Sequence, residues 1–274
     1  MKLHTTDRSL KRKQQKQTFL TAMPNDFLST AIETALEAGD FLRRHFETDI
    51  KIAEKFSHDI KIELDNLAQE KIIASILKDY PEHQIIGEEG SIGSKDSEIC
   101  WIVDPLDGTV NFTYGIPHFC ISIAVQKRGK TIAGVIYDPM RGELFTVSEP
   151  GYPKLNGKVI KSSQRSFLSE SIGVIGFSRT KETIAKATDL FFNLVPKVRK
   201  IRFTGSAALD LAYVACGRLD FYIEQQIQIW DIAAGILLVE KSGGKIMTKP
   251  IIEGKTFSLK ATNGSLNLDF VTFD

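Results

Sequence analysis

Cysteine, long apolar runs and net charge are all scarce in this sequence. The 274 residues include three cysteines, Cys100, Cys120 and Cys216, which are widely spaced within apolar runs. This odd and small number excludes a disulfide scaffold and predicts reduced core residues of a cytoplasmic protein. No stretch resembles a secretory signal or a membrane-spanning helix, which argues against a membrane protein. The net charge of +1 provides no global field that would attract nucleic acid or a membrane surface.

The charge is nevertheless uneven along the chain. Residues 1–23 carry six basic side chains against Asp7, a net charge of +5, which leaves about −4 for the rest. With little apolar material to bury, this segment is predicted to be a disordered basic tail. A targeting peptide, or a start codon upstream of Met23, are the alternatives. Residues 24–274 are expected to form one domain with two intimate subdomains, roughly 24–160 and 161–274.

Apolar periodicity predicts an α+β fold in which helices and strands do not form regular βαβ units. Helices are expected from Asp26 to about His45, from a cap at Asp65 to Leu77, over 181–194, and after Gly205 and Trp230. Strands are expected at 60–64, 85–86, 101–104, 120–126, 131–137, 143–147, 158–160, 172–175, 200–203 and 221–224, with two more at the end of the chain. Pro150 to Gly157 and Ser91 to Glu98 are expected to be loops.

Four carboxylates stand at the predicted ends of elements, beside glycine, proline or alanine. They are Glu88, Asp104, Asp107 and Asp231. Because no histidine or cysteine accompanies them, the set favours Mg²⁺ or Mn²⁺ over zinc. Asp104 and Asp107 straddle a turn, so both side chains and the carbonyl of Leu106 can reach one volume. The alternative is that each acid only caps a helix or closes a turn.

A small helix start in the second half supports phosphate chemistry. Thr204-Gly205-Ser206-Ala207 opens a predicted helix, where N–H groups and the helix dipole can receive a phosphate. Many helices begin in this way, so the motif gains meaning only beside a metal site.

Three motifs together resemble the signatures of the inositol monophosphatase family. The members of this family are Mg²⁺-dependent, lithium-sensitive sugar-phosphate phosphatases. The three motifs are Gly87-Glu88-Glu89, the stretch from Trp101 to Phe112 that contains Asp-Pro-Leu-Asp-Gly-Thr, and Trp230-Asp-Ile-Ala-Ala-Gly235. The resemblance covers residues 24–274, and the stretch from Thr204 to Ala215 is similar to the bacterial branch. It implies a layered α-β-α-β-α sandwich of the sugar phosphatase type and a homodimer.

The resemblance also implies a role for each matched residue. Glu88, Asp104 and the Leu106 carbonyl would bind a first Mg²⁺, and Asp104, Asp107 and Asp231 a second; a third ion near Glu88 is left open. Thr109 with Glu88 would orient the attacking water, so that Glu88, Thr109 and Asp104 are the catalytic residues. The substrate would lie against Asp107, Gly108, Thr109, Gly205, Ser206, Ala207, Glu224 and Asp231.

The sequence therefore predicts a Mg²⁺-dependent phosphomonoesterase that hydrolyses inositol monophosphate or a related small sugar phosphate by metal-activated water. Fructose 1,6-bisphosphate and histidinol phosphate are the alternative substrates, because Gln225 to Gln228 depart from the usual family pattern near the leaving group. In another class, the fold would serve as a non-catalytic binding partner in a transcription complex. No membrane partner is expected, and a nucleic-acid partner is supported only by the basic tail.

Overall fold

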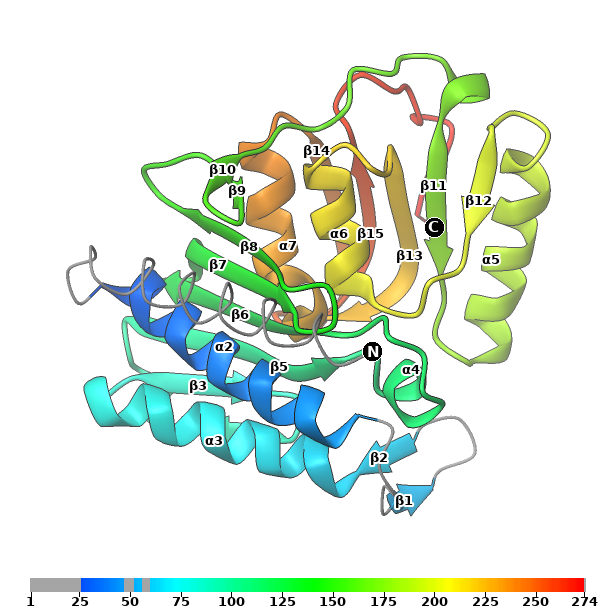
Figure 1. The fold of residues 1–274 in the computed structure, drawn as a ribbon. Coiled ribbons are helices and arrows are strands. Elements are labelled where there is room, and N and C mark those ends of the chain that lie inside the picture. The colour runs from blue at the N-terminus through cyan, green and yellow to red at the C-terminus, as the bar shows by residue number, and fades with distance from the viewer. Residues whose placement is uncertain (1–25, 47–51, 56–59, 274) are drawn as a thin grey trace, which may run out of the picture.

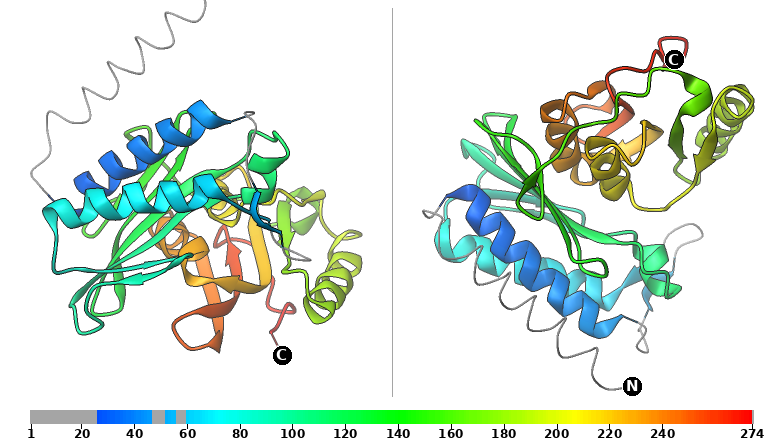
Figure 2. Two further views of the ribbon diagram at one scale, coloured as in Figure 1. Left: turned by 90° about the horizontal axis from the view of Figure 1, so that it is seen from below. Right: turned by 45° about the horizontal axis from the view of Figure 1, so that its top comes forward.

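A computed structural model describes residues 26–46, 52–55 and 60–273, with the backbone alone described for 52–55 and 60–62. Helices and sheets alternate in five layers, α-β-α-β-α (Figure 1), as predicted. Figure 2 shows the same layers from two further directions. The predictions for the basic segment 1–23 lie outside the described residues. Among the described helices, none is both long and apolar enough to cross a membrane.

Helices α2 (Phe27–His45) and α3 (Glu63–Asp79) form the first layer and pack on one face of the larger sheet. The predicted cap of α2 is confirmed, because Oδ1 of Asp26 accepts a hydrogen bond from the N–H of Ser29 at 2.8 Å. The end of α3 before Pro81 is also as predicted. Ahead of α3, the short strands β1 (Ile52–Lys55) and β2 (Ile60–Ile62) pair with each other.

The second layer is an eight-stranded sheet in the order β10-β9-β8-β7-β6-β5-β3-β4. Only the β3–β5 pair is parallel; the other neighbours are antiparallel. The predicted hairpin after β6 is confirmed, with Arg128 and Gly129 both at positive φ in the turn. The strands are β3 (Gln84–Gly87), β4 (Gly90–Ile92), β5 (Ile99–Asp107), β6 (Cys120–Lys127), β7 (Lys130–Asp138), β8 (Glu143–Ser148), β9 (Lys154–Leu155) and β10 (Lys158–Val159).

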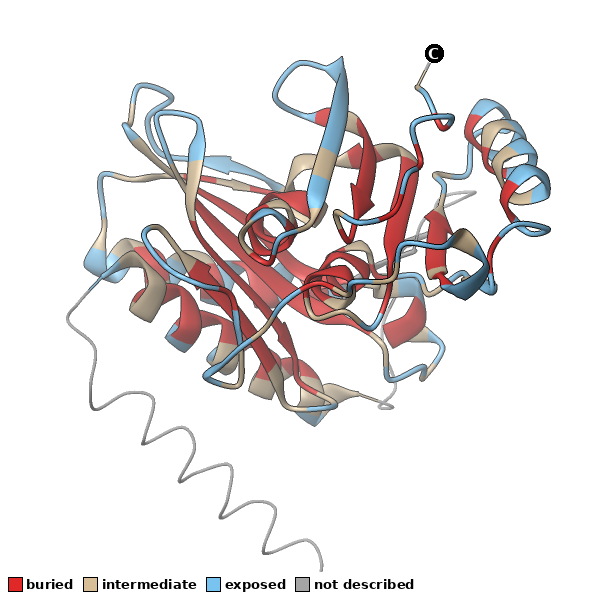
Figure 3. Ribbon diagram, turned by 90° about the horizontal axis from the view of Figure 1, so that it is seen from above, coloured by how far each residue is buried: buried red, intermediate tan, exposed pale blue. Residues whose placement is uncertain are grey.

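Helices α6 (Ala207–Ala215) and α7 (Ile229–Lys241) form the middle layer between the two sheets. Small residues let α7 approach the larger sheet closely: a Cβ on Gly134 of β7 would lie 3.1 Å from Cα of Ala234. This close packing carries the N-terminus of α7 toward β5. Figure 3 shows that burial is concentrated in these helices and in the central strands.

The fourth and fifth layers are a five-stranded sheet and helix α5 (Lys181–Leu194), which packs on its outer face. The strand order is β12-β11-β13-β15-β14, with β11 parallel to both of its neighbours. The short connections are α4 (Thr109–Thr113) and η1 (Leu168–Glu170). The strands are β11 (Ile172–Gly176), β12 (Lys200–Arg202), β13 (Phe221–Gln228), β14 (Lys245–Ile252) and β15 (Thr256–Thr262).

Several local predictions were wrong. The strand predicted at 60–64 ends at Ile62, and α3 begins at Glu63, so Asp65 lies inside the first turn of the helix and does not cap it. The two predicted loops contain short strands, β4 and β9, because both segments pair with a neighbour in the sheet. Strand β13 continues to Gln228, past the predicted end at Glu224, through an irregular register with β15.

Candidate metal centre

Strand β5 places Asp104 on the face of the larger sheet that carries α6 and α7. Successive side chains of a strand point to opposite faces. Trp101 and Val103 pack in the core with α2 and α3, whereas Ile102 packs in the core with α6 and α7. Asp104 follows Ile102 by two positions and so shares its face, where it is 2% exposed. Its Oδ1 accepts a hydrogen bond from the N–H of Leu106 at 2.9 Å.

An irregularity in β5 brings Asp107 to the same volume. In a regular strand, residues three apart lie on opposite faces. The register between β5 and β6 shifts between Asp104 and Asp107, at Pro105, which has no N–H to donate to the ladder. Gly108 then takes φ of 98°, which glycine adopts without strain, and α4 begins. The Asp-Pro-Leu-Asp-Gly sequence is therefore the local reason why two carboxylates converge.

Asp231 reaches these two acids from the first turn of α7. Its Oδ2 accepts a hydrogen bond from the N–H of Gln228 at 3.1 Å, so the capping interpretation is also correct. One carboxylate oxygen from each of Asp104, Asp107 and Asp231 lies within 4.8 Å of the others. Asp231 follows Asp107 and Asp104 by 124 and 127 positions, yet the three acids form one group. Asp104 and Asp107 are buried and Asp231 is half-buried, and the group is called here the buried triad.

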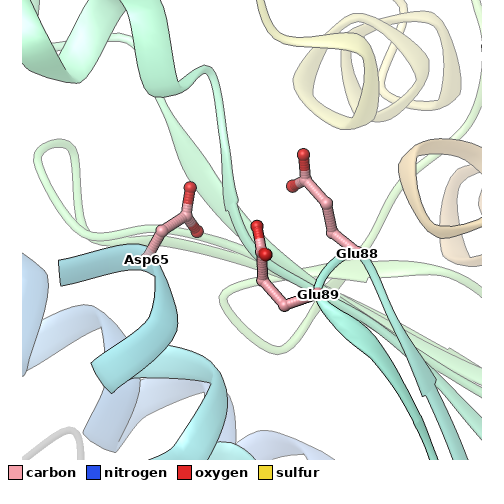
Figure 4. Close-up of side chains that lie close together, drawn as sticks. All are labelled: Asp65, Glu88 and Glu89. Carbon is pink, nitrogen blue, oxygen red and sulfur yellow. The ribbon is translucent and has the colours of Figure 1, made fainter. Parts of the chain in front are cut away.

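A second group of carboxylates lies nearby at the start of α3 and in the turn after β3. Asp65, Glu88 and Glu89 extend into one space (Figure 4), and their carboxylate oxygens lie within 4.8 Å of one another. Asp65 is 2% exposed, and the two glutamates are half-buried. The turn is tied to α3 because the N–H of Glu89 donates to Oε1 of Gln69 at 3.2 Å. This group is called here the outer triad.

Thr109 connects the two triads. Its hydroxyl lies 3.2 Å from Oδ2 of Asp65 and 3.1 Å from the carbonyl oxygen of Leu106, and it donates toward both. Leu106 stands between Asp104 and Asp107, so the hydroxyl joins the outer triad to the backbone of the buried triad. Glu88 also acts across the gap, since its charge raises the pKa of Asp104 and of Asp231.

Burial raises the pKa of all three acids of the buried triad, and negative neighbours add to the rise for Asp104 and Asp231. Burial is the largest cause for Asp104, followed by the charges of Glu88 and Asp107. For Asp231, burial and then the charge of Asp107 raise the pKa to about 8. Burial also raises the pKa of Asp107, although hydrogen bonds from the first turn of α6 offset part of that rise. The ionised triad is therefore unfavourable without a compensating positive charge.

The first turn of α6 supplies the hydrogen bonds to Asp107. Its Oδ2 accepts from Oγ of Ser206 at 2.6 Å and from the N–H of Ala208 at 2.8 Å, and its Oδ1 accepts from the N–H of Ala207 at 3.3 Å. The helix start that was predicted to receive a phosphate thus directs two of its N–H groups at a protein carboxylate. Gly205, at φ of 85°, precedes this turn.

Glu224 lies in β13, near Asp231. It is 6% exposed, and its Oε2 accepts a hydrogen bond from the hydroxyl of Tyr222 at 3.2 Å, while its Oε1 has no hydrogen-bond partner among the described residues. Burial raises the pKa of Glu224 to about 8. The sequence did not indicate Asp210 or Tyr222, which influence the same region. Asp65 and Glu89 were also not predicted as site residues. For Asp65, the available signal was its place as an acid in the first turn of a helix that follows a short strand.

The buried triad fits a divalent cation. Its donors are carboxylate oxygens, which Mg²⁺ and Mn²⁺ prefer. Among the described residues, no lysine or arginine forms an ion pair with these acids. Because buried charges need a partner or a metal, the missing counter-charge is best supplied by a cation. The fold and the two triads define a class of layered α+β proteins with an acidic site able to hold divalent cations.

The chain belongs to the inositol monophosphatase family: the model of that family matches residues 23–265. This confirms the resemblance, and the family is metal-dependent. Among curated proteins, the chain is 41% identical over 221 residues to the Nus factor SuhB of Escherichia coli. The aligned residues cover 79% of this chain and 83% of that protein.

Solved structures show the same fold. The extragenic suppressor protein suhB from Bartonella henselae has a TM-score of 0.80 and 36% identity, and covers 86% of this chain and 93% of its own. An inositol monophosphatase from Anabaena has a TM-score of 0.77 and 37% identity, and covers 87% and 91% respectively.

Proposed function

We propose that this protein is a Mg²⁺-dependent phosphomonoesterase that hydrolyses inositol monophosphate or a related small sugar phosphate. The observation that carries the proposal is the buried triad, with its raised pKa values and without a basic partner in the described structure. The similarity to a protein whose solved structure is titled an inositol monophosphatase supports the substrate class.

In this proposal Asp104, Asp107 and Asp231 hold one cation, and Glu88, Asp104 and the carbonyl of Leu106 hold another. A third ion would use the outer triad. When bound, such cations lower the pKa of a coordinated water and neutralise the charge on phosphate and on the leaving alcohol.

The chain's own residues position the water and the substrate. Since the Thr109 hydroxyl shares its hydrogen between Asp65 and the carbonyl of Leu106, its lone pairs are available to accept a hydrogen bond from the attacking water. Thr109 and Glu88 would orient this water, as the family resemblance implies, and Asp65 would in turn orient the Thr109 hydroxyl. Ser206 and Ala207 would line the phosphate side, with Gly205 shaping the turn. The Glu224 carboxyl group would accept a hydrogen bond from a substrate hydroxyl.

A phosphate-release screen tests the proposal. Inositol 1-phosphate, fructose 1,6-bisphosphate and histidinol phosphate are each incubated with the full chain, with Mg²⁺ or with a chelator. We expect release from inositol 1-phosphate with Mg²⁺ and none with the chelator. Faster release from either alternative would change the substrate, and no release from any of them would reject the enzymatic function.

The names of the curated relatives favour a second candidate function, that of a partner in a transcription complex. Proteins named Nus factor SuhB are 38 to 41% identical to this chain. We propose that this protein joins such a complex in addition to its chemistry, because the acids of the site are intact. Co-purification with RNA polymerase from the native host tests this role, with Asp231→Asn as a variant that separates binding from turnover.

A cytoplasmic homodimer with an intimate pair of subdomains is also part of the proposal. Light scattering of the full chain would give twice the monomer mass of 30.6 kDa if the dimer forms. A single monomer mass would reject it.

A further inference from the structure

The orientation of Asp107 depends on one helical turn. Three of its hydrogen bonds come from Ser206, Ala207 and Ala208, all in or next to the first turn of α6. The fourth contact is the thiol of Cys120 on β6, 3.6 Å from Oδ2. A shift of the α6 start by a fraction of an ångström would therefore rotate the Asp107 carboxylate relative to Asp104 and Asp231.

That turn is itself held at Thr204, on the other side of Gly205. The Thr204 hydroxyl donates to Oδ2 of Asp210 at 2.5 Å, and the Thr204 carbonyl accepts from Nδ2 of Asn111 at 2.9 Å. Asn111 belongs to α4, the helix that begins directly after Asp107 and Gly108. The contacts thus close a ring that runs from Asp107 through α6 and Thr204 back to the segment that follows Asp107.

The aspartate at position 210 is not explained by its contribution to the stability of the fold. It is 2% exposed, and its second oxygen, Oδ1, has no hydrogen-bond partner within the part of the chain that the structure describes. It has no ion pair in the described structure, and a buried carboxyl with an unpaired oxygen is costly. A leucine or alanine would pack in this apolar helix without that cost, so the contact with Thr204 is the feature that distinguishes Asp210.

We propose that Asp210 and Thr204 are positioning residues that hold the first turn of α6 so that Asp107 faces the cation. This pair is called here the Asp210–Thr204 clasp. The inference rests on the cation site of the proposed function, but not on its substrate. Outer partners of metal ligands commonly act in this way, and their removal weakens metal binding.

The test measures Mn²⁺ binding to the full chain by isothermal titration calorimetry, without substrate, together with the melting temperature of the metal-free protein. Thr204→Val and Asp210→Ala each break the clasp, whereas Thr204→Ser keeps the hydroxyl and Asp210→Asn keeps an acceptor oxygen. Thr34→Val is the matched control, because it removes a buried hydroxyl contact, 3.0 Å from Oγ of Ser75, between α2 and α3.

We expect Thr204→Val and Asp210→Ala to weaken Mn²⁺ binding about tenfold or more, with the double variant no weaker than the weaker single one. Thr204→Ser and Asp210→Asn should bind Mn²⁺ within about twofold of the wild type. Thr34→Val should lower the melting temperature as much as Thr204→Val does and leave Mn²⁺ binding unchanged.

The outcomes separate the clasp from the proposed function. If the wild type binds Mn²⁺ and the clasp variants bind it equally well, the clasp is rejected and the cation site stands. The clasp is also rejected if Thr34→Val weakens binding as much as Thr204→Val. If the wild type itself binds no Mn²⁺, both the clasp and the cation site are rejected.

Discussion

The buried triad and the outer triad contain the same kind of atom, yet their surroundings differ. Asp104 and Asp107 are 2% and 8% exposed, Asp231 is half-buried, and α6 and α7 hold the buried triad from two sides. In the outer triad only Asp65 is buried, and the two glutamates sit in a half-exposed turn. A rigid, poorly solvated group of carboxylates gains most from a bound cation, whereas an exposed group is stabilised by water already.

Because of this difference, we expect the two triads to have different functions. The buried triad is suited to tight cation binding, and the outer triad, through Thr109, is suited to orienting water and to a weaker ion. Substitutions in one triad at a time separate these two roles, and the largest effect is expected in the buried triad.

Asp231→Asn should abolish Mg²⁺-dependent phosphate release, by about three orders of magnitude or more, because removing a ligand from a catalytic metal site removes the charge stabilisation of the transition state. The fold should remain intact, since the variant removes one of three repelling carboxylates. Phosphate release and circular dichroism measure the two effects. Unchanged turnover would show that Asp231 is only a helix cap.

Thr109→Val should lower turnover about a hundredfold while leaving Mn²⁺ binding close to that of the wild type, because the hydroxyl orients water and is not itself a predicted metal ligand. Asp65→Asn should have the same direction with a smaller loss. Single-turnover kinetics at saturating Mg²⁺, paired with calorimetry, measure both. A large loss of Mn²⁺ binding in Thr109→Val would mean that the two triads form a single site.

The stability of the metal-free protein should fall as the pH rises from about 4 to about 8. The pKa of Asp231 is raised to about 8 in the folded chain, so the folded state binds more protons than the unfolded state over that window. Its contribution to stability is therefore present at low pH and is lost as the pH rises through the folded pKa.

Thermal unfolding at several pH values, with and without Mg²⁺, measures this slope. Mg²⁺ should flatten it, and Asp231→Asn should flatten it without Mg²⁺. A slope that Asp231→Asn leaves unaltered would show that other groups cause the pH dependence.

Glu89→Gln should have the smallest effect, a change of less than about threefold in Mg²⁺ affinity, because a half-exposed carboxylate is largely screened by water. The Mg²⁺ concentration that gives half-maximal phosphate release measures it. An effect as large as that of Asp231→Asn would place the principal cation in the outer triad.

The sequence predicted the parts of the site that depend on local rules. Acid, proline and glycine at the end of β5 determine where the strand becomes irregular, and Trp230-Asp231 marks a helix start, so both could be located without the fold. The five layers followed from the mixed pattern of elements together with the family resemblance.

Asp65, Glu89 and Asp210 could not be assigned in the same way. Whether Asp65 caps a helix or faces a site depends on where α3 begins, and an offset of three residues changed the answer. The contact of Asp210 with Thr204 depends on the path of the chain around Gly205, which has no sequence periodicity. Tertiary packing determines these positions, and local patterns do not report it.

The central claim is that Asp104, Asp107 and Asp231 bind a divalent cation. Anomalous diffraction from crystals grown with Mn²⁺ tests it directly, because the signal locates the ion without reference to activity. The account predicts a strong anomalous peak in contact with carboxylate oxygens of all three residues and a weaker one beside Glu88. Mn²⁺ found only at surface acids, with none at the buried triad, would contradict it.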